Sequence, residues 1–370
     1  MKVLFIGVYK DGTGWGNAAQ NYILALDAAG VDVVPRAVKL NNIDAEVPER
    51  ILELEGKDSQ GCDIVIQNVL PHHMEYNGTF QKNIGIYFTE TTHFRNSGWP
   101  QKLNLMDELW VPNFQMVFAA RDSGVRTRMR TIHIPTDIEK YKYANYEPID
   151  LGFDGDRFVF YFVGEVIRRK NIVALLKAFH LEFSPDEPVE LVIKGNLSGL
   201  NPEETGKHVS EICNQIKNNL KLYPSISNYK QEKIITDMVS NDDLMRIHST
   251  CDCFVCPSFG EAWCIPAFDA MCMGNTPIVN DCTGLGEFVN NDNGWLVDNT
   301  KEPVFGMTES FSDLYVGNED WWGIDIGHLK GCMRQAYESD RSDKRRACLE
   351  RRECFSYEKI GQEMKEHLSA

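Results

Sequence analysis

Residues 257–279 read PSFGEAWCIPAFDAMCMGNTPIV, and they carry the clearest structural pattern of the sequence. An apolar strand is expected to end at Pro257, and a glycine-containing turn follows that carries Glu261. A helix is expected to begin near Pro266, because proline suits the first turn of a helix. The free N–H groups and the dipole at a helix start favour an anion. Glu261 and Asp269 can therefore face one ligand at the carboxyl end of a parallel sheet.

Strand-length apolar runs alternate with helix-length periodic segments on both sides of this stretch, which predicts a parallel α/β fold. In the first half, strands are expected at residues 3–8, 31–34, 64–67, 84–88 and 109–111, and helices at 17–29 and 115–123. In the second half, strands are expected at 158–163, 191–193, 253–256 and 276–279, and helices at 171–183 and 355–368. The pattern does not resolve the elements between residues 187 and 233.

The length of 370 residues suits two domains rather than one. The segment Lys142–Asp156 is polar and contains Pro148 and two glycines, which is typical of an interdomain linker. We therefore expect an N-terminal domain over residues 1–145 and a C-terminal domain over residues 150–354, each with its own α/β core.

The net charge of −16 does not favour nucleic acid or an anionic membrane as a partner. No apolar run approaches the roughly 20 residues of a transmembrane helix, and the apolar start of the chain is interpreted as a buried strand. Two basic clusters interrupt the acidic background, one at Arg121, Arg126, Arg128 and Arg130 and the other at Arg341, Lys344, Arg345, Arg346, Arg351 and Arg352. They are interpreted as solvated faces, with docking of an anionic acceptor or a nucleic acid as the alternative.

Eleven cysteines are scattered without the spacing of a secreted domain, which predicts a cytoplasmic protein with free, mostly buried thiols. Three of them, Cys251, Cys253 and Cys256, resemble a metal motif at first sight. Alternation along a strand would place Cys256 on the opposite face from the other two, which does not suit a tetrahedral site. No H-E-x-x-H motif occurs, and we expect no metal.

The acidic pair Glu261 and Asp269, followed by Gly274 and Pro277, resembles the pattern of retaining glycosyltransferases of the GT-B fold, the group often called family 4. The resemblance implies two Rossmann-like domains with a ligand cleft between them, and a C-terminal helix at 355–370 that returns to the first domain. It implies transfer of a hexose-type sugar from a nucleotide diphosphate sugar to a hydroxyl acceptor, which could be a glycan, a lipid or a small molecule. Retention at the anomeric carbon and the absence of any cofactor besides the donor are also implied.

The same resemblance assigns roles to residues within the segment 257–279. Glu261 would contact hydroxyls of the donor sugar, and Asp269 would bind the ribose. The backbone amides of Trp263, Cys264 and Ile265 would face the donor phosphates.

A second donor-binding segment is a basic turn after the strand at 158–163. The resemblance implies that a basic pair beyond Gly164 neutralises the donor diphosphate, and Lys170 matches the family lysine. Glu165 replaces the arginine that usually follows the glycine, so we expect Arg169, or failing that Arg168, to supply the missing charge. Cations at a helix start are unfavourable without an anion, which supports a phosphate site.

The first half offers less specific signals. Gly14 and Gly16 lie in a glycine-rich turn that the resemblance places against the donor phosphates, and their spacing does not match the G-x-G-x-x-G pattern of dinucleotide-binding enzymes. Glu90 and His93 follow a strand where relatives carry a polar cluster that touches the transferred sugar, so both are candidate catalytic residues.

Three alternative functions remain open at this level. The first is a sugar-nucleotide epimerase or hydrolase of the same fold, and the second is a non-catalytic protein that binds sugar nucleotides. The third is a transferase that adds a sugar to nucleic acid bases.

Overall fold

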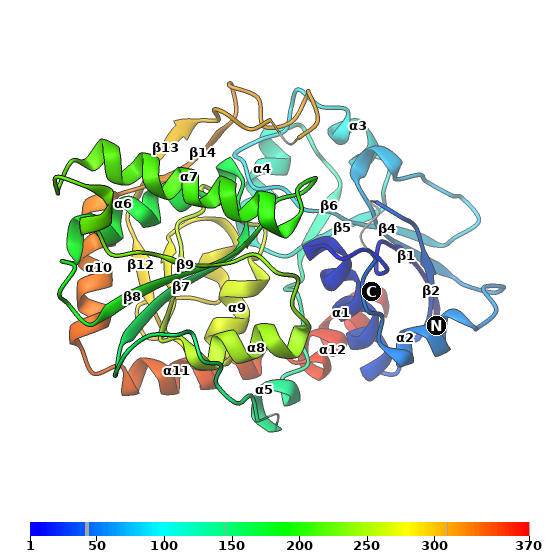
Figure 1. Ribbon diagram of the computed structural model, residues 1–370. Helices are drawn as coiled ribbons and strands as arrows, with labels where there is room; N and C mark the ends of the chain where they lie inside the picture. The colour runs from blue at the N-terminus through cyan, green and yellow to red at the C-terminus, as the bar shows by residue number, and fades with distance from the viewer. Residues whose placement is uncertain (41–43, 144, 309, 370) are drawn as a thin grey trace. The chain divides into compact units, whose positions relative to one another are not determined.

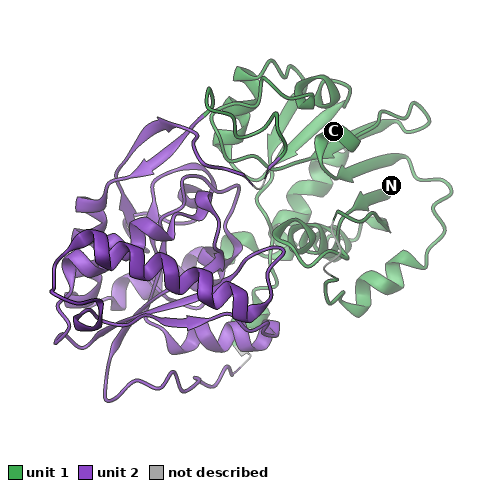
Figure 2. Ribbon diagram, turned by 45° about the horizontal axis from the view of Figure 1, so that its top comes forward, with its two compact units in different colours: residues 1–142, 311–319, 352–370 green, residues 143–310, 320–351 purple. Residues whose placement is uncertain are grey.

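The structure is a computed structural model that describes residues 1–40, 44–143, 145–308 and 310–369 (Figure 1). The chain divides into two compact units, coloured separately in Figure 2. Unit 1 comprises Met1–Lys142, Phe311–Glu319 and Arg352–Ala370, and unit 2 comprises Tyr143–Ser310 and Asp320–Arg351.

Unit 1 contains a six-stranded parallel sheet, in the strand order β2-β1-β3-β4-β5-β6. The strands are β1 (Lys2–Gly7), β2 (Asp32–Ala37), β3 (Ile64–Asn68), β4 (Lys82–Ile86), β5 (Glu108–Val111) and β6 (Arg128–Thr131). Five of these strands were predicted to within a few residues, and β6 was missed because its residues alternate basic and apolar character without a buried run.

The helices of the first part of the chain are α1 (Gly14–Ala28), α2 (Glu49–Glu55), α3 (Trp99–Leu103), α4 (Phe114–Asp122) and α5 (Glu139–Tyr143). Helix α1 begins three residues earlier than predicted, because Thr13 Oγ1 accepts a hydrogen bond from the Gly16 N–H at 3.2 Å and so caps the helix. Helix α4 begins one residue before the predicted range of 115–123, with Asn113 Oδ1 accepting from the Met116 N–H at 2.9 Å.

The C-terminal helix α12 (Tyr357–Ser369), preceded by the short η5 (Glu353–Phe355), belongs to unit 1 and packs against α1. Gly361 permits this close approach, since a Cβ atom there would lie 2.1 Å from the Ala25 carbonyl oxygen. Hydrogen bonds fasten both ends of α12, from Tyr357 Oη to Asn21 Oδ1 at 2.6 Å and from Lys365 Nζ to the Ala29 carbonyl at 2.7 Å.

Unit 2 contains a second six-stranded parallel sheet, in the order β12-β11-β10-β7-β8-β9. Its strands are β7 (Phe158–Glu165), β8 (Val189–Asn196), β9 (Lys233–Ile235), β10 (Cys253–Cys256), β11 (Ile278–Asn280) and β12 (Trp295–Val297). The described residues 145–157 form no helix or strand, whereas the first residues of the predicted linker, Lys142 and Tyr143, lie in α5.

Helices cover both faces of the unit 2 sheet. They are α6 (Ile172–Glu182), α7 (Pro202–Leu220), α8 (Asn241–Thr250), α9 (Ile265–Cys272), α10 (Ile326–Glu338) and α11 (Ser342–Arg352), with short turns η2 (Arg168–Lys170), η3 (Ile226–Asn228) and η4 (Thr283–Glu287). Phe160 and Phe162 of β7 face the core shared by α6, α7 and α10. Tyr161 points to the opposite face, where its hydroxyl bonds His248 of α8 at 2.7 Å.

A two-stranded antiparallel ribbon, β13 (Asn299–Pro303) with β14 (Asp320–Ile324), completes unit 2. The residues Phe311–Glu319 between its strands belong to unit 1, whereas the predicted boundaries assigned them to the C-terminal domain. The difference arises from polar contacts with the loop after β4, which the sequence pattern does not reveal. One is the 2.8 Å hydrogen bond from Thr91 Oγ1 to Glu319 Oε2.

The structure also shows the state of the cysteines and the character of the helices. All eleven cysteines carry free thiols, and most are buried, as predicted. Across the described ranges, none of the helices has the length and apolar character needed to cross a bilayer.

Candidate functional site

The turn after β10 holds Glu261 rigidly inside unit 2. The Glu261 N–H donates to Thr283 Oγ1 at 2.8 Å, and the Glu261 carbonyl accepts from the Gly284 N–H at 2.8 Å. Gly284 is required at this contact, since a Cβ atom would lie 2.1 Å from the Ala262 carbonyl oxygen. The Glu261 side chain is buried, with 4% of its surface exposed.

The basic turn after β7 meets this carboxylate. Lys170 Nζ lies 2.7 Å from Glu261 Oε1, and Arg169 Nη1 lies 3.1 Å from Glu261 Oε2. The backbones of the two turns are also joined, by the Phe259 N–H donating to the Arg169 carbonyl at 2.9 Å. Arg168 points elsewhere, with its guanidinium over the ring of Phe259. Of the two arginines that the sequence offered, Arg169 is therefore the one beside Glu261.

The charges in this cluster stabilise each other. Burial disfavours ionisation of Glu261, but the cations of Lys170 and Arg169 outweigh burial and hold the pKa of Glu261 at about 2. Burial likewise disfavours the Lys170 ammonium, and the nearby Glu261 carboxylate outweighs it and raises the pKa of Lys170. All three side chains are therefore charged at neutral pH.

The start of α9 lies directly after the Glu261 turn. Cys264, the residue directly before the helix, adopts a left-handed conformation with φ of 68°, and no side chain caps the helix. Uncapped N–H groups at a helix start are suited to an anion. Trp263 fixes the approach to the helix by packing against Phe268 and Phe288. Asp269 lies in α9 and is buried.

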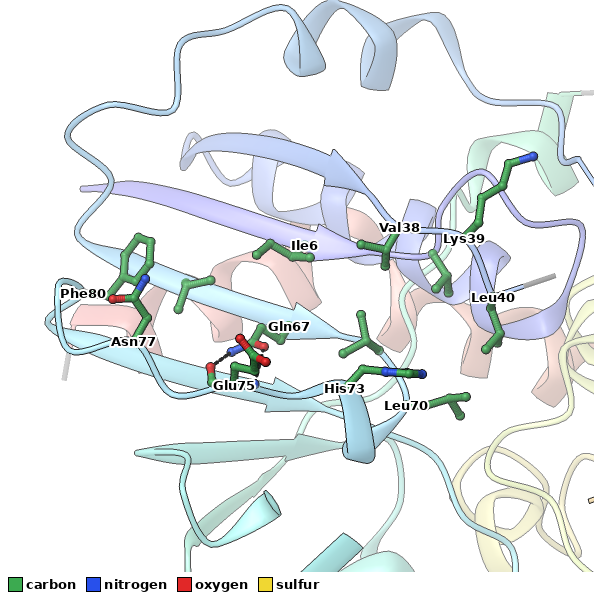
Figure 3. A pocket seen from close by; sticks show the side chains of 13 residues that line it. Ile6, Val38, Lys39, Leu40, Gln67, Leu70, His73, Glu75, Asn77 and Phe80 are labelled. Atoms are coloured by element: carbon green, nitrogen blue, oxygen red, sulfur yellow. Dashed lines mark hydrogen bonds between the residues drawn. The ribbon is translucent and has the colours of Figure 1, made fainter. Parts of the chain in front are cut away.

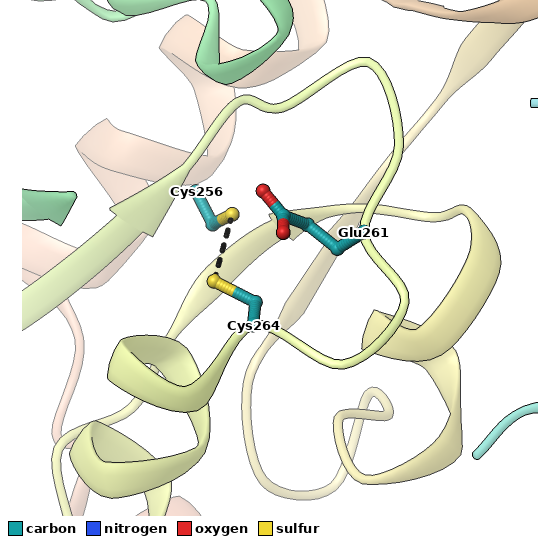
Figure 4. Close-up of side chains that lie close together, drawn as sticks. All are labelled: Cys256, Glu261 and Cys264. Atoms are coloured by element: carbon teal, nitrogen blue, oxygen red, sulfur yellow. Dashed lines mark hydrogen bonds between the residues drawn. The ribbon is translucent and has the colours of Figure 1, made fainter. Parts of the chain in front are cut away.

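Figure 4 shows Cys256, Glu261 and Cys264 side by side. One potential ligand atom from each lies within 4.8 Å of the others, and this is the group of metal-ligating atoms that the described residues bring together. It is not the set Cys251, Cys253 and Cys256 that the sequence suggested and we rejected. Lys170 and Arg169 already contact both oxygens of Glu261, which leaves a poor environment for a further cation.

The glycine-rich turn in unit 1 has two different glycines. Gly16 is buried in α1, where a Cβ atom would lie 1.9 Å from the Asp11 carbonyl oxygen, so this glycine is needed for the fold. Gly14 is exposed at the first position of α1, and a Cβ atom there would meet nothing within 4 Å. Only Gly14 therefore leaves room for a ligand beside its backbone.

Glu90 and His93 lie in the loop after β4 and are bound by the segment Phe311–Glu319. Tyr315 Oη donates to Glu90 Oε2, and His93 Nε2 lies 2.8 Å from the Asn318 carbonyl oxygen. Since only an N–H can bond a carbonyl, the proton of neutral His93 is on Nε2, and Nδ1 is a buried acceptor without a partner among the described residues.

Glu319 is the carboxyl group at the end of this segment, and it is 1% exposed. Burial raises its pKa to about 7, against the opposing effect of the hydrogen bond from Thr91. Nothing in the sequence pattern singled out Tyr315 or Glu319, because they lie in an irregular segment far along the chain from Glu90.

A hollow of about 420 Å³ lies on the unit 1 sheet, and Figure 3 shows the side chains that line it. The connection from β3 to β4 contains only the short η1 (Pro71–His73), so no crossover helix covers this part of the sheet. Gln67 lines the floor, and its amide bonds both the N–H and the carbonyl of Glu75. The lining is mainly apolar, with a polar rim. It comprises Ile6, Val8, Val38, Lys39, Leu40, Val65, Gln67, Val69, Leu70, His73, Glu75, Asn77 and Phe80.

The basic clusters are largely used within the fold. In the second cluster, Arg341 bonds Asp252 and Lys344 bonds the carbonyls of Asn291 and Gly294. In the first, Arg128 and Arg130 lie 3.8 and 3.9 Å from the buried carboxylate of Glu108. These contacts give several cations of both clusters a role within the fold, which neither the interpretation as solvated faces nor the alternative of a docking surface included.

The sequence-predicted residues thus fall into separate groups. The structure brings together Arg169, Lys170, Glu261 and Cys264 in unit 2 and pairs Gly164 with Gly195 on the neighbouring strand. Trp263, Ile265 and Asp269 are positioned by the same turn and helix. Gly14, Gly16, Glu90 and His93 are in unit 1. The sequence missed Thr283 and Gly284, although their position directly after β11 could have indicated a second loop at the same sheet edge.

Two sequence comparisons bear on this site. Residues 146–304 match the family described as Glycosyl transferases group 1. The serotype-specific mannosyltransferase WbdA of Escherichia coli is 29% identical over 130 residues, which cover 34% of this chain and 14% of that protein. The match therefore spans only a small part of the length of this relative.

Solved structures resemble the whole chain. HepE of Anabaena, in complex with UDP and glucose, has a TM-score of 0.66 at 14% identity and covers 100% of both chains. Sucrose-phosphate synthase of Thermosynechococcus elongatus has a TM-score of 0.66 at 16% identity, covering 100% of this chain and 98% of that one. These likenesses confirm the predicted fold class, an α/β GT-B fold with two Rossmann-like sheets.

Proposed function

Because residues 146–304 match the family described as Glycosyl transferases group 1, we propose that this protein is a retaining glycosyltransferase that uses a nucleotide diphosphate sugar. The observation that carries the proposal is the buried contact of Lys170 and Arg169 with Glu261, beside the uncapped start of α9. The contact joins two segments that the sequence separately identified as donor-binding.

The cluster suits a sugar diphosphate. An ammonium has three donors, and Glu261 Oε1 takes one from Lys170, so the remaining capacity can serve a phosphate oxygen. The amides of Trp263, Cys264 and Ile265 would supply further donors to the diphosphate. Together they would stabilise the negative charge that develops on the leaving diphosphate, which is the main electrostatic task of this reaction.

Glu261 would bind sugar hydroxyls rather than act as an acid or a nucleophile. Its pKa of about 2 keeps it ionised at neutral pH, so it has no proton to give, and both of its oxygens are already held by cations. In the proposed reaction the anomeric C–O bond to the diphosphate breaks, and the acceptor oxygen bonds the same face. The acceptor proton passes to a leaving phosphate oxygen. Asp269 would bind the ribose, and Glu90 and His93 would contact the transferred sugar.

The relatives suggest which donors to test first. HepE was solved with UDP and with UDP-glucose, and WbdA is named as a mannosyltransferase. A hexose linked to UDP or another nucleoside diphosphate is therefore the proposed donor. No further cofactor and no metal are needed in this scheme, since the cations of Lys170 and Arg169 face the diphosphate.

The acceptor is proposed to be a hydroxyl compound with an apolar portion. The hollow in unit 1 supports this choice, because its floor is apolar and its rim carries Lys39, His73 and Glu75 (Figure 3). Alkyl glycosides of increasing chain length should then accept sugar faster than the free sugars. Equal rates for both sets would argue against the hollow as part of the acceptor site.

A panel of nucleotide sugars in a thermal-shift assay tests the function. A donor at 100 times its Kd should stabilise the protein by about 2.7 kcal/mol. Product analysis then separates the alternatives, because an epimerase or hydrolase turns over without an acceptor and a binding protein gives a shift without turnover. A nucleic acid acceptor would show steep salt dependence of binding.

A further inference from the structure

Two cysteine sulfurs face each other beneath the Glu261 turn. Cys256 is the last residue of β10, Cys264 precedes α9, and their Sγ atoms lie 3.6 Å apart (Figure 4). Both thiols are free and buried, with 1% and 8% of the residue exposed.

We propose that Cys256 and Cys264 are a modification site, at which a mild oxidant such as hydrogen peroxide forms a reversible disulfide that weakens donor binding. The effect on the donor rests on the proposed function, whereas formation of the disulfide does not. The two residues enclose the segment 257–263, which carries Glu261.

The geometry requires only a modest movement. A disulfide has an S–S length of about 2.0 Å, so the sulfurs must approach by roughly 1.5 Å from their present separation. Rotation of two side chains can supply part of this approach, and the rest must come from the backbone of the turn. Cys264 is in a left-handed conformation, where few side chains settle without strain, so its backbone is the part expected to shift.

The contact between the two sulfurs supports the chemistry. The hydrogen bond from Cys264 lowers the pKa of Cys256; burial and the Glu261 carboxylate oppose this effect, and the Lys170 cation acts in the same direction as the hydrogen bond. A thiolate attacks an oxygen of the peroxide, the O–O bond breaks, and a sulfenic acid and hydroxide form. The second thiol attacks that sulfur and displaces hydroxide. In sum, two thiols and one peroxide give one disulfide and two waters.

The effect of the disulfide on donor binding follows from where the two cysteines lie. The amide of Cys264 is one of the groups proposed to face the diphosphate, and Glu261 lies between the two cysteines. A displacement of about 1 Å in a binding group can cost up to 100-fold in rate. A metal ion at the same three residues is the weaker interpretation, because Lys170 and Arg169 already occupy the Glu261 carboxylate.

Peptide mapping tests the disulfide without any donor. The reduced protein is treated with hydrogen peroxide, remaining thiols are alkylated, and chymotrypsin cleaves after Phe259 and Trp263. We expect the fragments with Cys256 and Cys264 to stay joined until dithiothreitol is added, in the wild type and in the control Cys332→Ala. Cys256→Ser should abolish the joined fragment. Its absence from the wild type, under conditions that oxidise the exposed Cys354, would overturn the proposal.

Calorimetric titration with UDP, GDP and ADP tests the consequence. Oxidation of the wild type should weaken the best nucleotide at least tenfold, and dithiothreitol should restore the reduced affinity. Treatment with peroxide should not change the nucleotide affinity of Cys256→Ser from the value that this variant has in its reduced form. Unchanged affinity in fully cross-linked wild type would overturn the effect on donor binding. If the reduced wild type binds none of the three nucleotides, the proposed function fails, and the mapping experiment still decides on the disulfide.

Discussion

Lys170 and Glu261 lie 91 positions apart in the chain and form a 2.7 Å ion pair in the interior of unit 2. Lys170 ends the turn after β7, and Glu261 lies in the turn after β10, the next strand of the same sheet. Parallel strands end at the same edge, so the order of strands brings these two turns together. The ion pair is therefore a product of the fold and provides the charge pattern on which the proposed function depends.

Acid should destabilise the protein through Glu261. Its pKa is about 2 in the folded chain, below the ordinary value of about 4.3, so folding is favoured when the group is ionised. This stability is present above the ordinary pKa and is lost as pH falls toward 2, with an upper limit of about 3 kcal/mol. Glu261→Gln should flatten the dependence of the unfolding free energy on pH in that range.

Urea denaturation at several pH values measures this slope. The exposed Glu203→Gln is the control, because Glu203 has only a surface pair with Lys207 and should leave the slope as in the wild type. A Glu261→Gln protein that keeps the wild-type slope would show that the carboxylate is not held by the two cations.

Glu319 should give the opposite pH dependence. Its pKa is raised to about 7 in the folded chain, so folding favours the protonated form. The stabilisation is fully present below the ordinary pKa of about 4.3 and is lost as pH rises to 7, up to about 4 kcal/mol. Glu319→Gln, which remains neutral, should keep stability constant over this range.

Hydrogen exchange of the loop after β4 is a local measure of this effect. In the wild type, exchange at Thr91 and its neighbours should accelerate between pH 5 and 7 beyond the intrinsic pH effect, since an ionised, buried Glu319 weakens the attachment of the segment 311–319. A loop that shows the same protection in the wild type and in Glu319→Gln at both pH values would contradict this account.

The two glycines of the first turn should respond differently to alanine. Gly16→Ala should destabilise unit 1 strongly, since its Cβ atom would overlap the Asp11 carbonyl. Gly14→Ala meets no neighbour in the structure and should fold like the wild type. If the donor approaches this backbone as proposed, Gly14→Ala should weaken donor binding at least tenfold with an unchanged unfolding midpoint. If Gly14→Ala binds the donor as tightly as the wild type does, Gly14 is not part of the donor site.

Much of the fold was predictable because buried strands and amphipathic helices leave periodic patterns. The strand β10, the Glu261 turn and the start of α9 are all evident in residues 257–279, and Asn113 identifies the start of α4. Helix α7, within the polar range 187–233, was not predicted, since it is held by its capping box at Asn201 and by packing of a narrow apolar face. Helix caps that depend on a single side chain also shifted the start of α1.

The site was predictable only in part, for a different reason. Resemblance identified Lys170 and Glu261 separately, and it offered two arginines without deciding between them. The choice of Arg169 depends on the three-residue turn η2, which directs Arg168 onto Phe259. Contacts such as Tyr315 with Glu90 join distant irregular segments, and neither residue has a local pattern that signals the other.

The proposed function requires that Lys170 and Glu261 belong to a site for a sugar diphosphate. Calorimetric titration of the wild type and Lys170→Ala with UDP, GDP and ADP tests it most directly, with Lys207→Ala as the control on an exposed face of α7. We expect Lys170→Ala to bind the best nucleotide at least tenfold more weakly, while Lys207→Ala should bind it like the wild type. Equal affinity of Lys170→Ala and the wild type would contradict it.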